Sequence, residues 1–75
     1  MNKDRLKQID EIIKNIEIIS DEIENVLDEE QFSFDNMPEN LQSSLNGERS
    51  EEAIENLEEA HEKIQEVKES LECVY

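Results

Sequence analysis

The fold is decided by residues 6–27, which read LKQIDEIIKNIEIISDEIENVL. Apolar side chains recur here at alternating steps of three and four residues, the spacing that places them on one face of an α-helix. We call this set the isoleucine row, and it consists of Ile9, Ile12, Ile16, Ile19, Ile23 and Val26. Leu6, Ile13 and Leu27 widen the face to an arc of roughly 160°. The pattern predicts a helix over residues 3–30 whose apolar face is wider than one neighbouring helix covers.

A second helical pattern occupies residues 50–73. Ser50, Glu51 and Glu52 suit its beginning, because a serine hydroxyl can accept from free backbone N–H groups and acids favour the positive end of the helix dipole. The apolar residues of this segment are Ala53, Ile54, Leu57, Ala60, Ile64, Val67, Leu71 and Val74. Their stripe is narrower, and its alanines permit a neighbouring helix to approach closely.

Residues 31–49 form a connector between the two helices. Pro38 followed by Glu39 is typical of a helix start, and Asn46 followed by Gly47 is typical of a helix end, so we expect one short helix around residues 38–45. Five apolar residues would cover the open end of the hairpin: Phe32, Phe34, Met37, Leu41 and Leu45.

These elements predict an all-α protein that forms a single domain over residues 1–75, an antiparallel helical hairpin of coiled-coil type with a short connector helix. A core of this size rarely leaves more than about 3–5 kcal/mol of net stability. One partner helix also leaves part of the broad isoleucine row uncovered. We therefore expect two copies to pair into a four-helix bundle, with the isoleucine row as the dimer interface. The alternative is a monomeric hairpin that the connector caps.

A more specific pattern lies in the connector, where residues 34–42 read FDNMPENLQ. Gly47-Glu48-Arg49 follows, and then residues 51–60 read EEAIENLEEA. The connector and the second helix, which carry these stretches and make up about half of the chain, resemble a group of uncharacterised small acidic helical proteins of bacteria and their phages that share Asp-Asn-Met-Pro-Glu-Asn-Leu-Gln. The resemblance implies a helical hairpin and a phage or mobile-element setting, and it implies no activity.

Catalytic and metal-binding patterns are weak in this sequence. Glu58-x-x-His61 has the spacing of a carboxylate–histidine metal motif, but Glu58 projects away from the apolar stripe toward solvent. One histidine and one cysteine give no nucleophile-and-base set. Gly47 is the only glycine, so a glycine-rich phosphate loop cannot form. We expect no metal, no cofactor and no enzymatic activity.

The net charge of −15 and the single cysteine, Cys73, indicate which classes of partner and which cellular compartment to expect. Nucleic acids and anionic lipids select lysine and arginine, so we expect direct binding to neither. Cys73 cannot form an internal disulfide, and we interpret it as a small apolar residue, with an intermolecular disulfide or a reactive thiol as the alternative. With no apolar stretch long enough for a signal peptide or a membrane span, we expect a cytoplasmic protein.

The distribution of charge predicts a binding surface. Residues 21–55 hold twelve acids and one base, which concentrates the negative charge at the connector end of a hairpin. The residues that we expect to bind a partner are Asp28, Glu29, Glu30, Asp35, Glu39, Glu51, Glu52, Glu55, Glu58 and Glu62. Carboxylates about 5–6 Å apart on a helix can replace phosphates in a basic groove. We therefore expect a DNA mimic or inhibitor of a basic nucleic-acid-binding protein. The alternative is an oligomerising structural or adaptor protein whose acids serve solubility.

Overall fold

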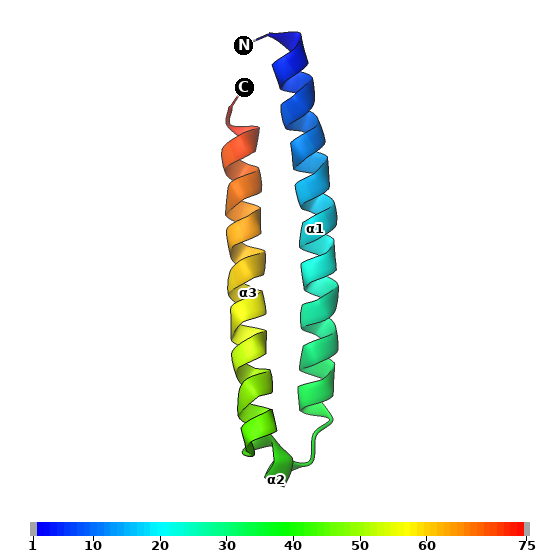
Figure 1. Cartoon of the computed structure of the whole chain (residues 1–75), viewed down its shortest axis with the longest axis vertical. Helices are drawn as coiled ribbons and strands as arrows, with labels where there is room; N and C mark the ends of the chain where they lie inside the picture. Colours follow the sequence, from blue (N-terminus) through cyan, green and yellow to red (C-terminus); the bar gives the residue numbers. More distant parts are fainter. Residues whose placement is uncertain (1, 75) are drawn as a thin grey trace.

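The computed structural model describes residues 2–74, and these form three helices. The long helices α1 (Lys3–Asp35) and α3 (Leu45–Glu72) lie side by side and antiparallel, and the short α2 (Glu39–Gln42) lies at the turn between them (Figure 1). The start of α1 and the end of α3 lie together at the opposite end of the hairpin. The backbone forms a rod with extents of 59 × 15 × 12 Å. The predicted all-α helical hairpin is confirmed.

Helix α1 extends five residues beyond its predicted end. Its first turn is capped by Asn2, whose Oδ1 accepts a hydrogen bond from the backbone N–H of Arg5 at 2.9 Å. Its last turn is closed by Asn36, whose side-chain amide donates to the carbonyl oxygen of Phe32 at 2.8 Å. A hydrogen bond of 3.0 Å from Gln31 Nε2 to Asp35 Oδ1 adds to this turn. Local polar side chains therefore continue α1 into the region that we expected to be connector.

Helix α3 begins five residues before its predicted start, because Ser44 and not Ser50 is its capping residue. The Ser44 hydroxyl accepts from the backbone N–H of Gly47 at 3.4 Å. Ser50 instead lies within the helix, and only 4% of it is exposed. The connector is therefore shorter than predicted and consists of a tight turn around α2. Gln42 Nε2 donates a hydrogen bond of 3.0 Å to the carbonyl oxygen of Phe34 and so holds α2 against the end of α1.

Gly47 does not end a helix, contrary to our expectation. It is a buried residue in the first turn of α3, and its φ is not positive. A Cβ atom at this position would lie 2.0 Å from the carbonyl oxygen of Gln42 and 2.6 Å from that of Leu41. Glycine is therefore required here because the backbone of α2 passes directly against α3.

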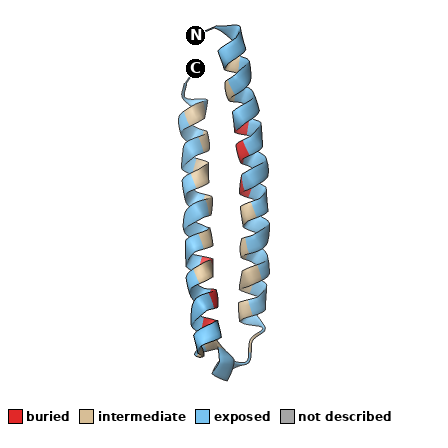
Figure 2. Cartoon of the chain, in the orientation of Figure 1, coloured by how far each residue is buried: buried red, intermediate tan, exposed pale blue. Residues whose placement is uncertain are grey.

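The two long helices meet along a seam of buried and half-buried residues with strict three–four spacing (Figure 2). On α1 the seam consists of Leu6, Ile9, Ile13, Ile16, Ser20, Ile23, Leu27, Glu30 and Phe34. On α3 it consists of Gly47, Ser50, Ile54, Leu57, His61, Ile64, Lys68 and Leu71. This is the heptad repeat of a two-stranded coiled coil, with polar residues at several core positions.

The core inside the seam is thin. Among the described residues the buried apolar side chains are Ile13, Ile16 and Ile54, which are 7–9% exposed. The accessible surface is 5817 Å². A compact monomer of 8.8 kDa would expose about 4,800 Å², so the rod exposes about 1,000 Å² more. A single hairpin covers only one side of each helix.

Candidate functional site

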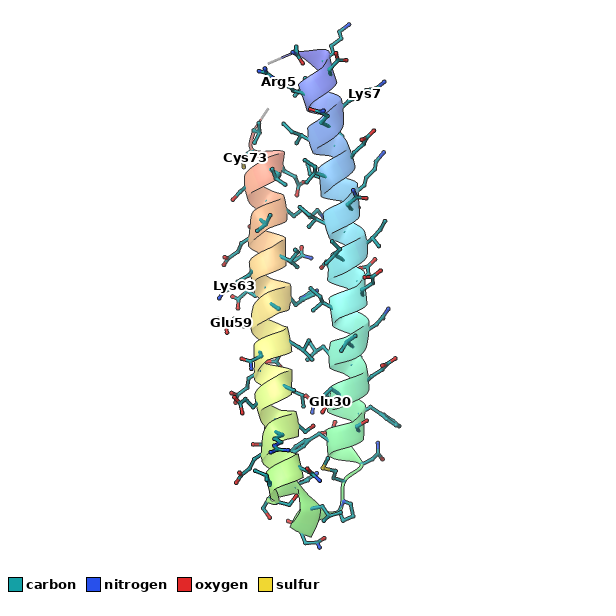
Figure 3. All side chains as sticks on the ribbon, viewed as in Figure 1. Arg5, Lys7, Glu30, Glu59, Lys63 and Cys73 are labelled. Atoms are coloured by element: carbon teal, nitrogen blue, oxygen red, sulfur yellow. The ribbon has the colours of Figure 1, made fainter. Side chains whose placement is uncertain are left out.

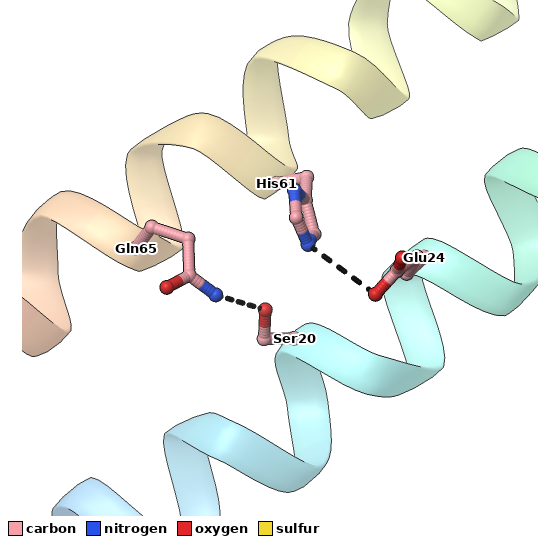
Figure 4. Close-up of polar contacts among 4 residues, drawn as sticks. All are labelled: Ser20, Glu24, His61 and Gln65. Atoms are coloured by element: carbon pink, nitrogen blue, oxygen red, sulfur yellow. Dashed lines mark hydrogen bonds and ion pairs between the residues drawn. The ribbon is translucent and has the colours of Figure 1, made fainter.

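Three of the polar contacts between α1 and α3 fix the register of the two helices. Glu17 Oε1 lies 3.3 Å from Lys68 Nζ, Gln65 Nε2 donates to Ser20 Oγ at 2.5 Å, and Glu24 Oε2 lies 3.9 Å from His61 Nε2. Figure 4 shows the last two pairs bridging the helices. From one contact to the next, the residue on α1 moves toward the end of that helix by as many positions as its partner on α3 moves toward the start of α3. The contacts therefore belong to one register of an antiparallel pair.

These contacts also show which heptad positions of α1 and α3 lie on the same side of the rod. In an antiparallel pair, equivalent heptad positions of the two helices lie on the same side of the seam, because one helix is reversed relative to the other. Glu17 and Glu24 on α1 occupy the same heptad position as Gln65 on α3, and all three border the seam at these contacts. The hairpin consequently has two distinct flanks, one on each side of the seam.

The flank that carries these contacts is strongly acidic. We call it the acidic flank, and among residues 2–74 its acids are Asp10, Glu17, Asp21, Glu24, Asp28, Asp35, Glu48, Glu51, Glu55, Glu58, Glu62, Glu69 and Glu72. Its bases are Lys3, Lys7 and Lys14, so its net charge is −10 out of −15 for the whole chain. The negative charge is therefore segregated across the rod as well as along it.

The opposite flank is apolar. We call it the apolar flank, and its central residues are Ile12, Ile19 and Val26 on α1 and Ala53, Ala60, Val67 and Val74 on α3. The five larger side chains are 44–50% exposed. The charged residues that border this flank are Arg5, Glu22, Glu29, Arg49 and Lys63, which leave it a net charge of +1.

The isoleucine row is divided between two environments. Ile9, Ile16 and Ile23 lie in the seam, where α3 of the same chain covers them. The remaining members, Ile12, Ile19 and Val26, lie on the apolar flank. A dimer interface made of the whole row is therefore not available in the folded hairpin, since half of the row already packs inside it.

The acids that we expected to bind a partner are likewise divided. Six of them lie on the acidic flank: Asp28, Asp35, Glu51, Glu55, Glu58 and Glu62. Glu30 lies in the seam and accepts a hydrogen bond of 2.6 Å from Ser50 Oγ, and Glu29 borders the apolar flank. Glu52 points away from the seam on the outer side of α3, and Glu39 begins α2. Glu39 also lines a shallow hollow at the turn with Glu48 and Glu51.

The outer side of α3 carries an ion pair between Glu59 and Lys63, whose oxygen and nitrogen atoms are 2.8 Å apart (Figure 3). The hydrogen bond and the positive charge of Lys63 lower the pKa of Glu59. The same hydrogen bond and the negative charge of Glu59 raise the pKa of Lys63. Both groups are fully exposed, so this pair adds little to the stability of the hairpin.

Glu58 and His61 do not converge on one point. Glu58 is exposed on the acidic flank, whereas His61 is half-buried in the seam beside Glu24. Among residues 2–74, no group of three or more His, Cys, Asp or Glu side chains is arranged to hold a metal ion. Within the same residues, no helix combines the length and the apolar character that crossing a membrane requires.

Comparison of this chain with family models, with curated proteins and with solved structures finds no match.

Proposed function

We propose that this protein is a binding module whose acidic flank docks onto a basic, nucleic-acid-binding protein and competes there with nucleic acid. The observation that supports the proposal is the segregation of charge, with a net charge of −10 on one flank and +1 on the other. Solubility alone needs no such segregation, because acids that are scattered over all sides serve it equally well.

The spacing of the acids suits a groove that otherwise holds one nucleic-acid strand. Thirteen acids along a rod of 59 Å correspond to one carboxylate per about 4.5 Å of its length. A single DNA strand carries one phosphate per about 3.4 Å, and a duplex carries one charge per about 1.7 Å of its axis. The flank therefore resembles one strand more closely than a whole duplex.

The position of the acids on two long helices supports the same proposal. The acids project from two long helices, so their positions are set before a partner arrives and little conformational entropy is lost on binding. Attraction between such a flank and a basic surface accelerates association and weakens as salt screens the charges. Direct binding to nucleic acid or to an anionic membrane is not part of the proposal, because either would place like charges together.

The alternative function is that of an oligomerising structural or adaptor protein whose acids only keep it soluble. The exposed apolar flank favours this alternative, since it offers a surface for contacts that do not depend on charge. The two functions differ in their response to salt: binding through the acidic flank weakens steeply, and binding through apolar contacts does not.

Two variants with the same net charge separate these functions. In E51Q/E55Q/E58Q all three changes lie on the acidic flank, and in E11Q/E22Q/E66Q all three lie outside it. Immobilised wild-type protein should retain DNA-binding proteins from a cell lysate at low salt and release them when single-stranded DNA is added. The first variant should lose most of this retention, and the second should keep it. Equal retention by both variants, or a neutral or acidic partner, would contradict the proposal.

A further inference from the structure

We infer that a second copy of this chain binds to the apolar flank. Two hairpins then pack against each other through these flanks and form a four-helix bundle, with an acidic flank on each outer face. This inference does not depend on the basic partner, because it uses the other side of the rod. It differs from a dimer through the whole isoleucine row in two respects. Only half of that row takes part, and α3 contributes as much surface as α1.

The apolar flank is continuous across both helices. The register set by the Ser20–Gln65 hydrogen bond brings Ile19 of α1 to the same level as Val67 of α3. One heptad further in each direction, the same register aligns Ile12 with Val74 and Val26 with Ala60. Apolar residues at both core positions and at one flanking position are the pattern of helices that pack inside a bundle, and not of an isolated pair.

The charges on this side suit a second copy of the chain. A chain with a net charge of −15 meets repulsion from its own copy wherever acids face each other. The apolar flank carries a net charge of +1, so two copies can approach through it while their acidic flanks point away from each other. Its bordering charges are of both signs, with Glu22 on α1 and Lys63 on α3, so the flank can form pairs with an identical flank.

The available area is sufficient for a stable dimer. The apolar residues of α3 extend from Ala53 to Val74, a length of about 30 Å along the helix, and two helices side by side are about 20 Å wide. Each copy would cover about 600 Å², for a total of about 1,200 Å², which is the lower bound for specific interfaces. This burial would also remove much of the surface that the monomer exposes in excess of a compact protein of its size.

Two neighbouring isoleucines provide a matched test. Ile19 lies on the apolar flank and is 44% exposed, whereas Ile18 points away from both the seam and this flank and is 58% exposed. I19E and I18E add the same charge to the same helical turn, and neither changes a buried residue. A carboxylate in the dimer interface would be buried in both copies, so I19E should weaken the dimer by at least about 100-fold, and I18E should not weaken it. V67E provides the same test from α3.

Sedimentation equilibrium of the full chain, at about 5–200 µM with a reductant to keep Cys73 unpaired, measures these outcomes. We expect the wild type and I18E to sediment at twice 8.8 kDa and I19E to shift toward 8.8 kDa. A wild type that remains at 8.8 kDa with full helical circular dichroism would overturn the inference, as would equal dissociation constants for I18E and I19E. Because I19E retains every acid, its retention of basic proteins separately reports on the acidic flank.

Discussion

Replacement of Gly47 by alanine tests the packing of the turn, because two effects of this change have opposite signs. In the interior of an exposed helix, alanine is more favourable than glycine by about 1 kcal/mol. Here the added Cβ would lie 2.0 Å from the carbonyl oxygen of Gln42 and 2.4 Å from its carbonyl carbon. Both are backbone atoms, so relief of the clash requires that α2 move away from α3.

Overpacking of this kind costs about 1–3 kcal/mol, and a contact with backbone belongs at the upper end of that range. After subtraction of the gain in helix propensity, G47A should destabilise the hairpin by about 1–2 kcal/mol. The melting temperature should then fall by about 5–15 °C. Thermal unfolding followed by circular dichroism measures this change, with N46A as a control at the neighbouring, exposed position, which should shift the stability by less than about 0.5 kcal/mol. A G47A variant that melts at or above the wild-type temperature would refute the close approach of α2.

Three further outcomes follow from the fold. I16A should destabilise the chain by about 2–5 kcal/mol in urea unfolding, whereas I18A should change stability little, because Ile16 is 7% exposed in the seam and Ile18 is 58% exposed; similar losses in both variants would contradict the seam. K63Q should raise the pKa of Glu59 toward its ordinary value of 4.5, because it removes the hydrogen bond and the charge that lower it; an unchanged midpoint in a carboxylate NMR titration would exclude that pair in solution. Raising the salt concentration at neutral pH should raise the melting temperature, since screening weakens the repulsion within a chain of net charge −15; a falling melting temperature would show that attractive ion pairs dominate.

The salt dependence has opposite signs for folding and for partner binding. Screening reduces repulsion among the acids of one chain and so favours the folded rod. The same screening reduces the attraction between the acidic flank and a basic partner, so binding weakens under conditions that stabilise the protein. A loss of binding at moderate salt therefore cannot be attributed to unfolding, and the two measurements check each other.

The two long helices could be predicted from spacing alone, but the seam between them could not. Ile9, Ile16 and Ile23 belong to two overlapping three–four patterns, one shared with Ile12 and Ile19 and the other with seam residues. The first pattern is the more apolar, so hydrophobicity favoured it. The structure uses the second, in which Ser20 faces the helix that supplies Gln65, and such a pairing depends on both helices at once.

The buried face of α3 was mispredicted for the same reason. The sequence pattern favoured Ala60 and Val67 as buried residues, whereas the seam contains His61 and Lys68 instead. Polar residues at three–four spacing are a weak signal for a core, because each is usually found at the surface. They are accommodated here since Glu24 and Glu17 lie across the seam from them. A search for complementary polar residues at matched steps on two antiparallel helices could have identified this register.

The turn was mispredicted for a related reason. Asparagine followed by glycine is a strong turn signal, and a helix through glycine loses about 1 kcal/mol relative to alanine. The sequence therefore favoured a helix end at Gly47. In the structure α3 begins at Leu45, before Gly47, and the residue is glycine because a side chain at this position would collide with Gln42, a tertiary contact that no local pattern contains.

The most direct test of the acidic flank is a competition titration against DNA. A captured basic protein is first bound to a fluorescent single-stranded DNA, and the anisotropy of this DNA is followed as this chain is added. The wild type and E11Q/E22Q/E66Q should release the DNA at concentrations that agree within about threefold, whereas E51Q/E55Q/E58Q should require at least about tenfold more. Equal losses in the two triple variants, or a chain that binds the protein without releasing the DNA, would contradict the proposed function.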